Sequence, residues 1–186
     1  MKLFENWTGI SSPDDGRRLA TANGNIFVGG NFWFVGGAPR RFLAALDTLD
    51  GQATAWRADA DDWVDALAIN GNTLYAGGWF RSIGGLPRNR IASLAAADGT
   101  VAAWNPGANG AVHALEAQPG LSVLAGGAFT NIGGASRPSL AALDTTTGEA
   151  TSWNPSARFE WCSAVYAISR ATDAIYVGGD FLARAD

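Results

Sequence analysis

The sequence is poor in lysine, glutamate and cysteine, and it has no long apolar run. Lys2 is the single lysine among 13 basic residues, and the 17 acidic residues include four glutamates. Lysine and glutamate are good helix formers, so their scarcity argues against a helical protein. The one cysteine, Cys162, cannot form an internal disulfide. The lack of an apolar stretch long enough for a spanning helix argues against insertion into a membrane.

Clustered positive charge is missing as well. The formal net charge is −4, and basic residues adjoin one another only in the pairs Arg17–Arg18 and Arg40–Arg41. A protein that binds nucleic acid needs a cationic face to neutralise phosphates. The sequence therefore predicts no nucleic-acid partner.

Glycine is abundant, and part of it marks an internal repeat. The chain has 24 glycines, and four Gly-Gly pairs each follow a short apolar run. The first glycines of these pairs are Gly29, Gly77, Gly126 and Gly178, at spacings of 48, 49 and 52 residues. Other residue types recur in register after the first three pairs: a phenylalanine, a second Gly-Gly pair, an arginine and a tryptophan. These are Phe32, Phe80 and Phe129; Gly36, Gly84 and Gly133; Arg40, Arg88 and Arg137; and Trp56, Trp104 and Trp153.

Each repeat unit is predicted to form four short antiparallel strands. Apolar segments alternate with turn signals such as Asn23-Gly24 and Asp98-Gly99, which supply the positive φ angles of tight hairpins. Units of this length and strand content are typical of β-propeller blades, which bury their faces by stacking in series around an axis. We therefore expect one all-β β-propeller domain over residues 1–186. Its units span approximately 8–56, 57–104, 105–153, and 154–186 together with 1–7.

The two ends of the sequence leave the closure of the propeller open. Trp7 precedes Trp56 by 49 residues, so the N-terminal segment matches the last strand of a unit. The C-terminal unit has no clear fourth strand. Either Leu3–Trp7 pairs with the last unit, in this chain or in a neighbouring copy, or the four units are part of a longer array.

The repeat resembles a known family. Its pattern is Val-x-Ala-Leu, Gly-Gly-x-Phe-x-x-Ile-Gly-Gly-x-x-Arg, Ile-Ala-x-Leu and Trp-Asn-Pro, best seen in residues 74–106 and 123–155. It resembles the delta-type β-propeller repeats of large secreted bacterial proteins, and similar units occur in fungal cortical-marker proteins. The resemblance implies a propeller, an extracellular or cell-surface location and a binding or structural role, with no catalytic residues to carry over. Kelch repeats are a weaker match, because Trp56 follows Gly30 by 26 residues without the tyrosine that kelch units place beside it.

Residues that recur in every unit are interpreted as structural. The Gly-Gly pairs are expected to allow tight bends and close packing of units, since no helix follows them as in a phosphate-binding loop. The repeated tryptophans are expected in the core or between units. The repeated arginines are expected to bond loop carbonyls or neighbouring carboxylates.

Residues that break the repeat are better candidates for function. Four tryptophans stand at positions where the other units have different residues, and they could stack on sugars or anchor a protein: Trp33, Trp63, Trp79 and Trp161. Ordinary partial burial is the alternative. Asp59, Asp61 and Asp62 form an acidic cluster that could ligate calcium, although the spacing is not that of an EF-hand and a solvated loop is the competing interpretation.

Three polar or aromatic residues occupy the second position of the predicted first strands. They are Asp65, His113 and Tyr166, and they could line a central channel. His113 has no serine, cysteine or second histidine in a catalytic or metal-binding pattern with it. We therefore expect a module that is not an enzyme and that acts as a protein-interaction or structural scaffold, with a protein partner or self-association. A carbohydrate-binding module is the alternative, and an enzyme acting on polysaccharides is a weaker one.

Overall fold

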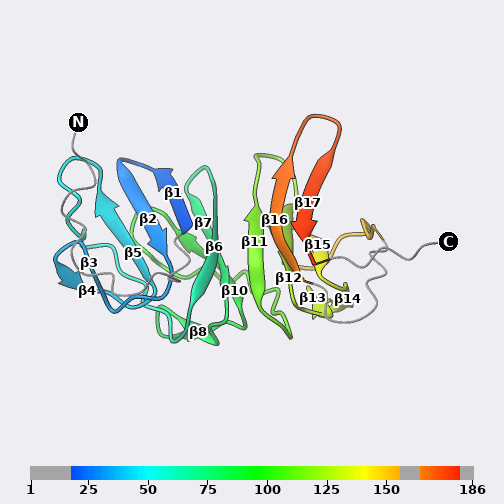
Figure 1. The fold of residues 1–186 in the computed structure, drawn as a ribbon, viewed down its shortest axis with the longest axis horizontal. Helices are drawn as coiled ribbons and strands as arrows, with labels where there is room; N and C mark the ends of the chain where they lie inside the picture. Colours follow the sequence, from blue (N-terminus) through cyan, green and yellow to red (C-terminus); the bar gives the residue numbers. More distant parts are fainter. Residues whose placement is uncertain (1–17, 156–163, 181–186) are drawn as a thin grey trace.

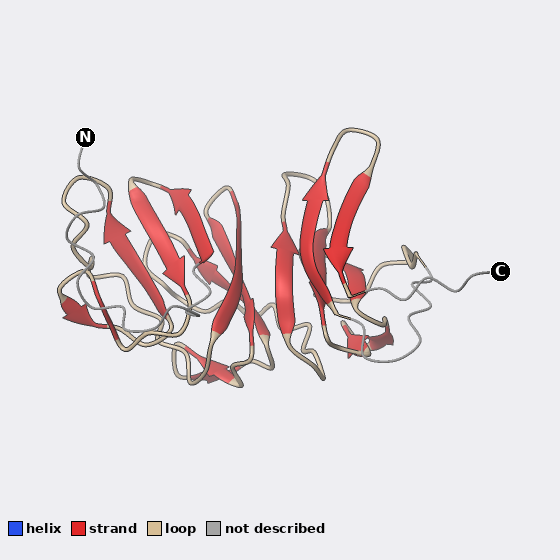
Figure 2. Ribbon diagram, in the orientation of Figure 1, coloured by secondary structure: helices blue, strands red, loops and turns tan. Residues whose placement is uncertain are grey.

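The computed structural model describes residues 18–155 and 164–180. The described residues contain strands, turns and loops, and no helix among them could span a membrane (Figure 2). The predicted all-β class is therefore confirmed for this part of the chain. Leu3–Trp7, Trp161 and Cys162 lie outside the described residues.

Each of the first three units is built around one three-stranded antiparallel sheet in which the second strand lies in the middle (Figure 1). The sheet of unit 1 contains β1 (Arg18–Ala22), β2 (Asn25–Gly29) and β5 (Leu43–Asp47). That of unit 2 contains β6 (Val64–Asn70), β7 (Thr73–Gly78) and β10 (Ile91–Ala95). That of unit 3 contains β11 (Val112–Glu116), β12 (Val123–Gly127) and β15 (Leu140–Leu143). Unit 4 is a hairpin of β16 (Val165–Arg170) and β17 (Ile175–Gly179).

The predicted fourth strand is reduced to a single bridge in the three complete units. Leu46 pairs with Ala53, Leu94 with Val101 and Leu143 with Ala150, and no longer ladder follows. The expectation of four-stranded sheets was therefore wrong in this respect. The chain leaves the sheet after this bridge because the tryptophan that follows reaches across to the next unit: Trp56 Nε1 donates to the carbonyl of Ala95 over 3.1 Å.

A small hairpin that the sequence analysis did not predict surrounds the second Gly-Gly pair of each complete unit. Both glycines of each pair have positive φ, for example 58° at Gly36 and 74° at Gly37, as a two-residue hairpin turn requires. These hairpins lie along the lower edge in Figure 1. Their strands are β3 (Phe34–Val35) and β4 (Ala38–Pro39), β8 (Ser82–Ile83) and β9 (Leu86–Pro87), and β13 (Asn131–Ile132) and β14 (Ala135–Ser136).

The first Gly-Gly pairs allow consecutive units to approach closely. A Cβ on Gly29 would lie 2.7 Å from Cγ1 of Val64 in unit 2, and one on Gly77 would lie 2.6 Å from Cγ1 of Val112 in unit 3. Gly126 faces Val165 of unit 4 in the same way. The predicted role of these glycines in packing units together is confirmed.

The repeated tryptophans join the same pairs of units. Trp56 packs edge-on against Phe27 at 5.2 Å, and both lie in a core cluster shared by units 1 and 2. Trp104 repeats this contact with Tyr75 at 5.2 Å in the cluster shared by units 2 and 3, and its Nε1 donates to the carbonyl of Asp144. We call these two contacts junction 1 and junction 2. The predicted structural role of Trp56 and Trp104 is confirmed.

The described sheets follow one another in an open series. First strands of neighbouring units lie side by side, β1 with β6, β6 with β11, and β11 with β16. The sheet of unit 1 and the hairpin of unit 4 lie at opposite ends of this series in Figure 1. The described residues form no closed ring.

Candidate functional site

Three of the predicted site residues occupy the same unusual backbone position. The ladder between the first and second strands shifts its register between Val64 and Ala66, between Val112 and Ala114, and between Val165 and Ala167. The residues in the three bulges are Asp65, His113 and Tyr166. A β-bulge leaves its extra residue unpaired and changes the direction of its side chain.

In units 2 and 3, the second glycine of the Gly-Gly pair that ends the second strand makes room for this bulge. A Cβ on Gly78 would collide with the carbonyl of Trp63, and one on Gly127 with that of Ala111. The Gly-Gly pair therefore serves two purposes, since its first residue admits the next unit and its second residue admits the bulge.

The bulges bring the predicted residues into contact with one another and with Trp79. His113 Nδ1 lies 2.9 Å from Oδ2 of Asp65, and its ring lies 5.3 Å from that of Tyr166 and 5.9 Å from that of Trp79. The Tyr166 hydroxyl donates to Oδ2 of Asp180 over 3.3 Å. We call Trp79, His113 and Tyr166 the aromatic row. It combines an exposed indole and phenol with a partly buried imidazole that contacts a carboxylate.

A cavity of about 220 Å³ adjoins the aromatic row and is lined by the first strands of all four units. Its lining includes Arg18, Leu67, His113 and Tyr166. Desolvation and the neighbouring Asp180 carboxylate raise the pKa of Tyr166 above its ordinary value. That this cavity belongs to the channel of a complete propeller stays a prediction.

Trp33 and Trp63 do not join the row. Trp33 is 61% exposed, lies under the guanidinium of Arg41 at 4.8 Å and contacts Phe42 edge-on at 5.9 Å. Trp63 is also exposed, and its carbonyl accepts a hydrogen bond from the backbone of Trp79. Trp33, Trp63 and Trp79 therefore do not form one platform.

The acidic cluster is divided among separate structural contacts. Arg57 pairs with Oδ2 of Asp59 at 2.7 Å, and Asp62 accepts from the backbone of Trp63. Asp61 Oδ1 accepts from the backbone amides of Arg81 and Ser82 over 2.8 and 2.9 Å. Among the described residues, no group of three histidine, cysteine or acidic side chains is placed to hold a metal ion. The calcium hypothesis thus gains no supporting geometry here.

The next unit shows what Asp61 does. Asn109 stands at the equivalent position, and its Oδ1 accepts from the amides of Thr130 and Asn131, both over 2.9 Å. A neutral amide therefore makes the same pair of bonds as the carboxylate. Burial by itself would raise the pKa of Asp61, but hydrogen bonds from the Ser82 and Arg81 backbone outweigh it and lower that pKa.

The repeated arginines are also structural. Arg88 Nη1 and Nη2 donate to the carbonyls of Pro87 and Ala102, and Arg40 and Arg137 bond the equivalent carbonyls. Each guanidinium therefore fastens the small hairpin to the segment before the tryptophan. The prediction that these arginines bond loop carbonyls is confirmed.

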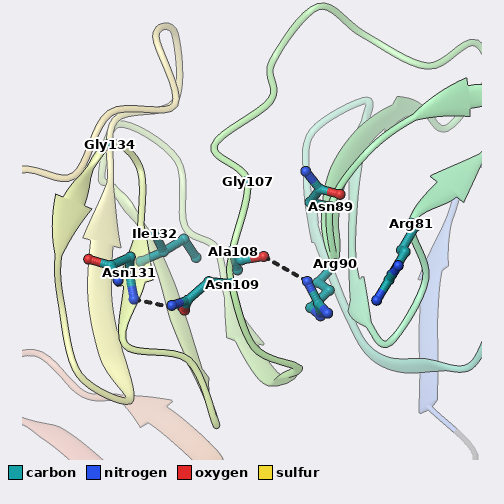
Figure 3. A pocket seen from close by; sticks show the side chains of 9 residues that line it. All are labelled: Arg81, Asn89, Arg90, Gly107, Ala108, Asn109, Asn131, Ile132 and Gly134. Carbon is teal, nitrogen blue, oxygen red and sulfur yellow. Dashed lines mark hydrogen bonds between the residues drawn. The ribbon is translucent and has the colours of Figure 1, made fainter.

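A polar crevice of about 540 Å³ that was not predicted from the sequence lies at junction 2. Figure 3 shows Arg81, Asn89 and Arg90 on the side of unit 2, and Asn109 and Asn131 on the side of unit 3. The segment at Gly107 and Ala108 runs between them, and none of the residues that line the crevice is acidic. The signal in the sequence is the replacement of Trp33 and Phe42 of unit 1 by Arg81 and Arg90 in unit 2.

Comparison with known proteins supports the repeat. Residues 21–53 and 72–101 match the model of a family described as "Domain of unknown function (DUF5122) beta-propeller". The two matches cover corresponding parts of units 1 and 2. No curated protein matches the chain. The fold and the family match together show that the chain contains repeats of the β-propeller class.

Proposed function

We propose that the chain is a non-catalytic β-propeller module of the delta type, which acts outside the cytoplasm as an interaction or structural scaffold. We further propose that it assembles with a second copy of itself. The observation that carries the proposal is the open face of unit 4, because the equivalent faces of units 1 and 2 are covered by the next unit.

The exposed fraction of one repeated aromatic residue shows that the face of unit 4 is open and that those of units 1 and 2 are covered. Tyr176 is 64% exposed, whereas the equivalent Tyr75 is 4% exposed and Phe27 is fully buried. Gly178 likewise meets no valine of a following unit, and its nearest contact is Cβ of Ala167 at 3.5 Å. Among residues 18–155 and 164–180, no first strand of a further unit lies on this face of unit 4.

The first strand of unit 1 offers a matching surface. Leu19 is 54% exposed, although the equivalent Leu115 is 8% exposed because it packs against unit 2. Joining β1 of one copy to unit 4 of another would repeat the junctions within the chain. Two copies joined in this way at both ends would close a ring of about eight units, within the range of propellers, and a two-fold axis permits it.

The mass of the protein in solution tests this assembly. We expect light scattering after size-exclusion chromatography to give the mass of two chains, and Tyr176→Asp or Leu19→Asp to give that of one. Leu49→Asp is the matched control, since Leu49 is 89% exposed in a turn. A single-chain mass for the unaltered protein, with no change in melting temperature for either variant, would contradict the proposal.

The aromatic row favours carbohydrate binding as a second candidate function. Trp79 and Tyr166 are 45% and 46% exposed on either side of His113, and exposed aromatic faces can stack on sugar rings. Affinity electrophoresis in gels containing neutral polysaccharides tests it. Trp79→Ala should abolish any retardation of the protein in the gel, and Trp33→Ala should not. If the two substitutions had equal effects, the aromatic row would not be the binding site.

The location outside the cytoplasm rests on the family resemblance. Fractionation of the producing cells and protease treatment of their surface would test it. Recovery of the protein solely from the cytosol would overturn this part of the proposal.

A further inference from the structure

The crevice at junction 2 has a lining that the repeat does not require. Junction 1 has the same glycine–valine contact and the same tryptophan bond, yet its corresponding rim has Trp33, Arg41 and Phe42 packed on one another. At junction 2 these positions carry Arg81, Asn89 and Arg90. The fold can therefore form with aromatic residues packed at this rim. The polar residues at the rim of junction 2 are not explained by the fold alone.

The two arginines of this crevice have unused hydrogen-bond donors. Arg81 is the one arginine of residues 18–155 and 164–180 whose side chain has no hydrogen bond, ion pair or ring contact within the described structure. Arg90 uses Nη1 to donate to the carbonyl of Ala108 over 3.0 Å, and its Nη2 makes no hydrogen bond within the described residues. Two guanidinium groups thus line one crevice without a carboxylate.

The backbone of Arg90 is held firmly enough to position its side chain. Its φ is 65°, its N–H donates to the carbonyl of Phe80 over 2.8 Å, and its carbonyl accepts from Gly78. Phe42 and Ser139 adopt the same conformation in their units, so the positive φ belongs to the repeat. Only the choice of arginine at this position is particular to unit 2.

Amide groups complete the lining. The side chain of Asn89 has no partner among the described residues, and Asn131 uses its Nδ2 to donate to Thr130 over 3.1 Å. Asn109, in contrast, is fully engaged by the backbone and Thr130. Asn89 and the oxygen of Asn131 can therefore pair with hydroxyl groups of a ligand.

We propose that this crevice binds an acidic sugar, with Arg81 and Arg90 taking its carboxylate and the amides of Asn89 and Asn131 taking its hydroxyls. Guanidinium groups match a carboxylate in geometry and charge. The volume of about 540 Å³ is that of a small-molecule site. No aromatic ring lines the crevice to stack on a neutral sugar, and its apolar side chains, Ala108 and Ile132, are already buried, which disfavours a peptide side chain.

Calorimetric titration of the full chain with digalacturonate tests the proposal. We expect saturable binding, no binding of the neutral lactose, and weaker binding at high salt because the contact is ionic. Arg81→Gln and Arg90→Phe should each weaken binding about tenfold or more, since a hydrogen bond to a charged group is lost. Arg90→Phe copies the residue that unit 1 has at this position.

Arg57→Gln is the control for general electrostatics. Arg57 is an exposed arginine of the loop before β6 and lies outside the crevice, so its loss should leave binding unchanged. The Arg81 side chain makes no contact that folding requires, and a matching melting temperature would show that Arg81→Gln is folded. The site does not depend on the assembly proposed above, so Tyr176→Asp should bind digalacturonate as the unaltered protein does.

Three results would overturn the proposal. The first is no saturable binding of digalacturonate. The second is an equal loss of binding in Arg81→Gln and Arg57→Gln, which would show non-specific attraction. The third is tighter, Arg81-dependent binding of a glutamate-rich peptide, which would assign the crevice to protein carboxylates instead.

Discussion

Junctions 1 and 2 share their interior and differ at their rim. In both, a glycine of one unit meets a valine of the next, and an indole donates to a backbone carbonyl of the following unit. At the rim, Trp33 and Phe42 pack together in junction 1, whereas Arg81 and Arg90 border a crevice in junction 2. The interior of the junction is thus constrained by packing, and the rim is free to carry function. Substitutions can test whether this division holds.

Removing the junction tryptophans should have the largest effect. Trp56→Ala and Trp104→Ala should each lower the free energy of unfolding by about 3–5 kcal/mol, because each deletes a buried aromatic side chain and its hydrogen bond. Urea unfolding measures the loss. Trp33→Ala, at an exposed rim position, should cost far less. A loss below about 1 kcal/mol at one junction alone would show that the two interiors are not equivalent.

Adding one carbon to the junction glycines should have an intermediate effect. Gly29→Ala and Gly77→Ala place a Cβ within 2.7 Å of a valine methyl, and such overpacking costs about 1–3 kcal/mol. Gly178→Ala is the matched control, because its new Cβ would make an ordinary contact at 3.5 Å. All three should be compared by urea unfolding in the Tyr176→Asp background, where assembly does not contribute. Equal losses at the three positions would mean that the valine contacts do not limit packing.

The interior of the junctions was largely predictable from the sequence. Gly77 and Trp104 recur at fixed spacing because each unit has the same packing requirement at these positions. Composition and turn residues likewise indicated short strands and no helix. The length of the fourth strand was overestimated. The pattern of apolar residues does not show that the chain must leave the sheet to bring Trp56 to Ala95.

The candidate sites were predictable only in part. The spacing placed Asp65, His113 and Tyr166 at one position, but the bulge that turns them toward each other depends on backbone register, for which the second glycine was the available signal. The sequence comparison singled out Trp33 as the departure from the repeat. In the structure its counterpart Arg81 lines a crevice, which could not be predicted because a crevice depends on which side chains leave space unfilled.

The smallest expected effect concerns Asp61, which makes the same bonds at junction 1 that Asn109 makes at junction 2. Asp61→Asn should change the free energy of unfolding at pH 7 by no more than about 0.5 kcal/mol, because the amide oxygen can accept the same two backbone hydrogen bonds. Urea unfolding at pH 7 measures this change, and Asn109→Asp is the reciprocal control.

The pH dependence of the free energy of unfolding should also distinguish Asp61→Asn from the unaltered protein. The pKa of Asp61 lies below its ordinary value of 3.8 in the folded protein, so the ionised group favours folding. Its contribution is fully present above that ordinary value and is lost as the pH falls through the lowered pKa of the folded state. Because an asparagine side chain does not take up a proton in acid, the Asp61→Asn protein should lose less stability than the unaltered protein between pH 7 and the acid range. Identical acid sensitivity of the two proteins would show that the backbone amides of Arg81 and Ser82 do not hold the carboxylate in the way the geometry indicates.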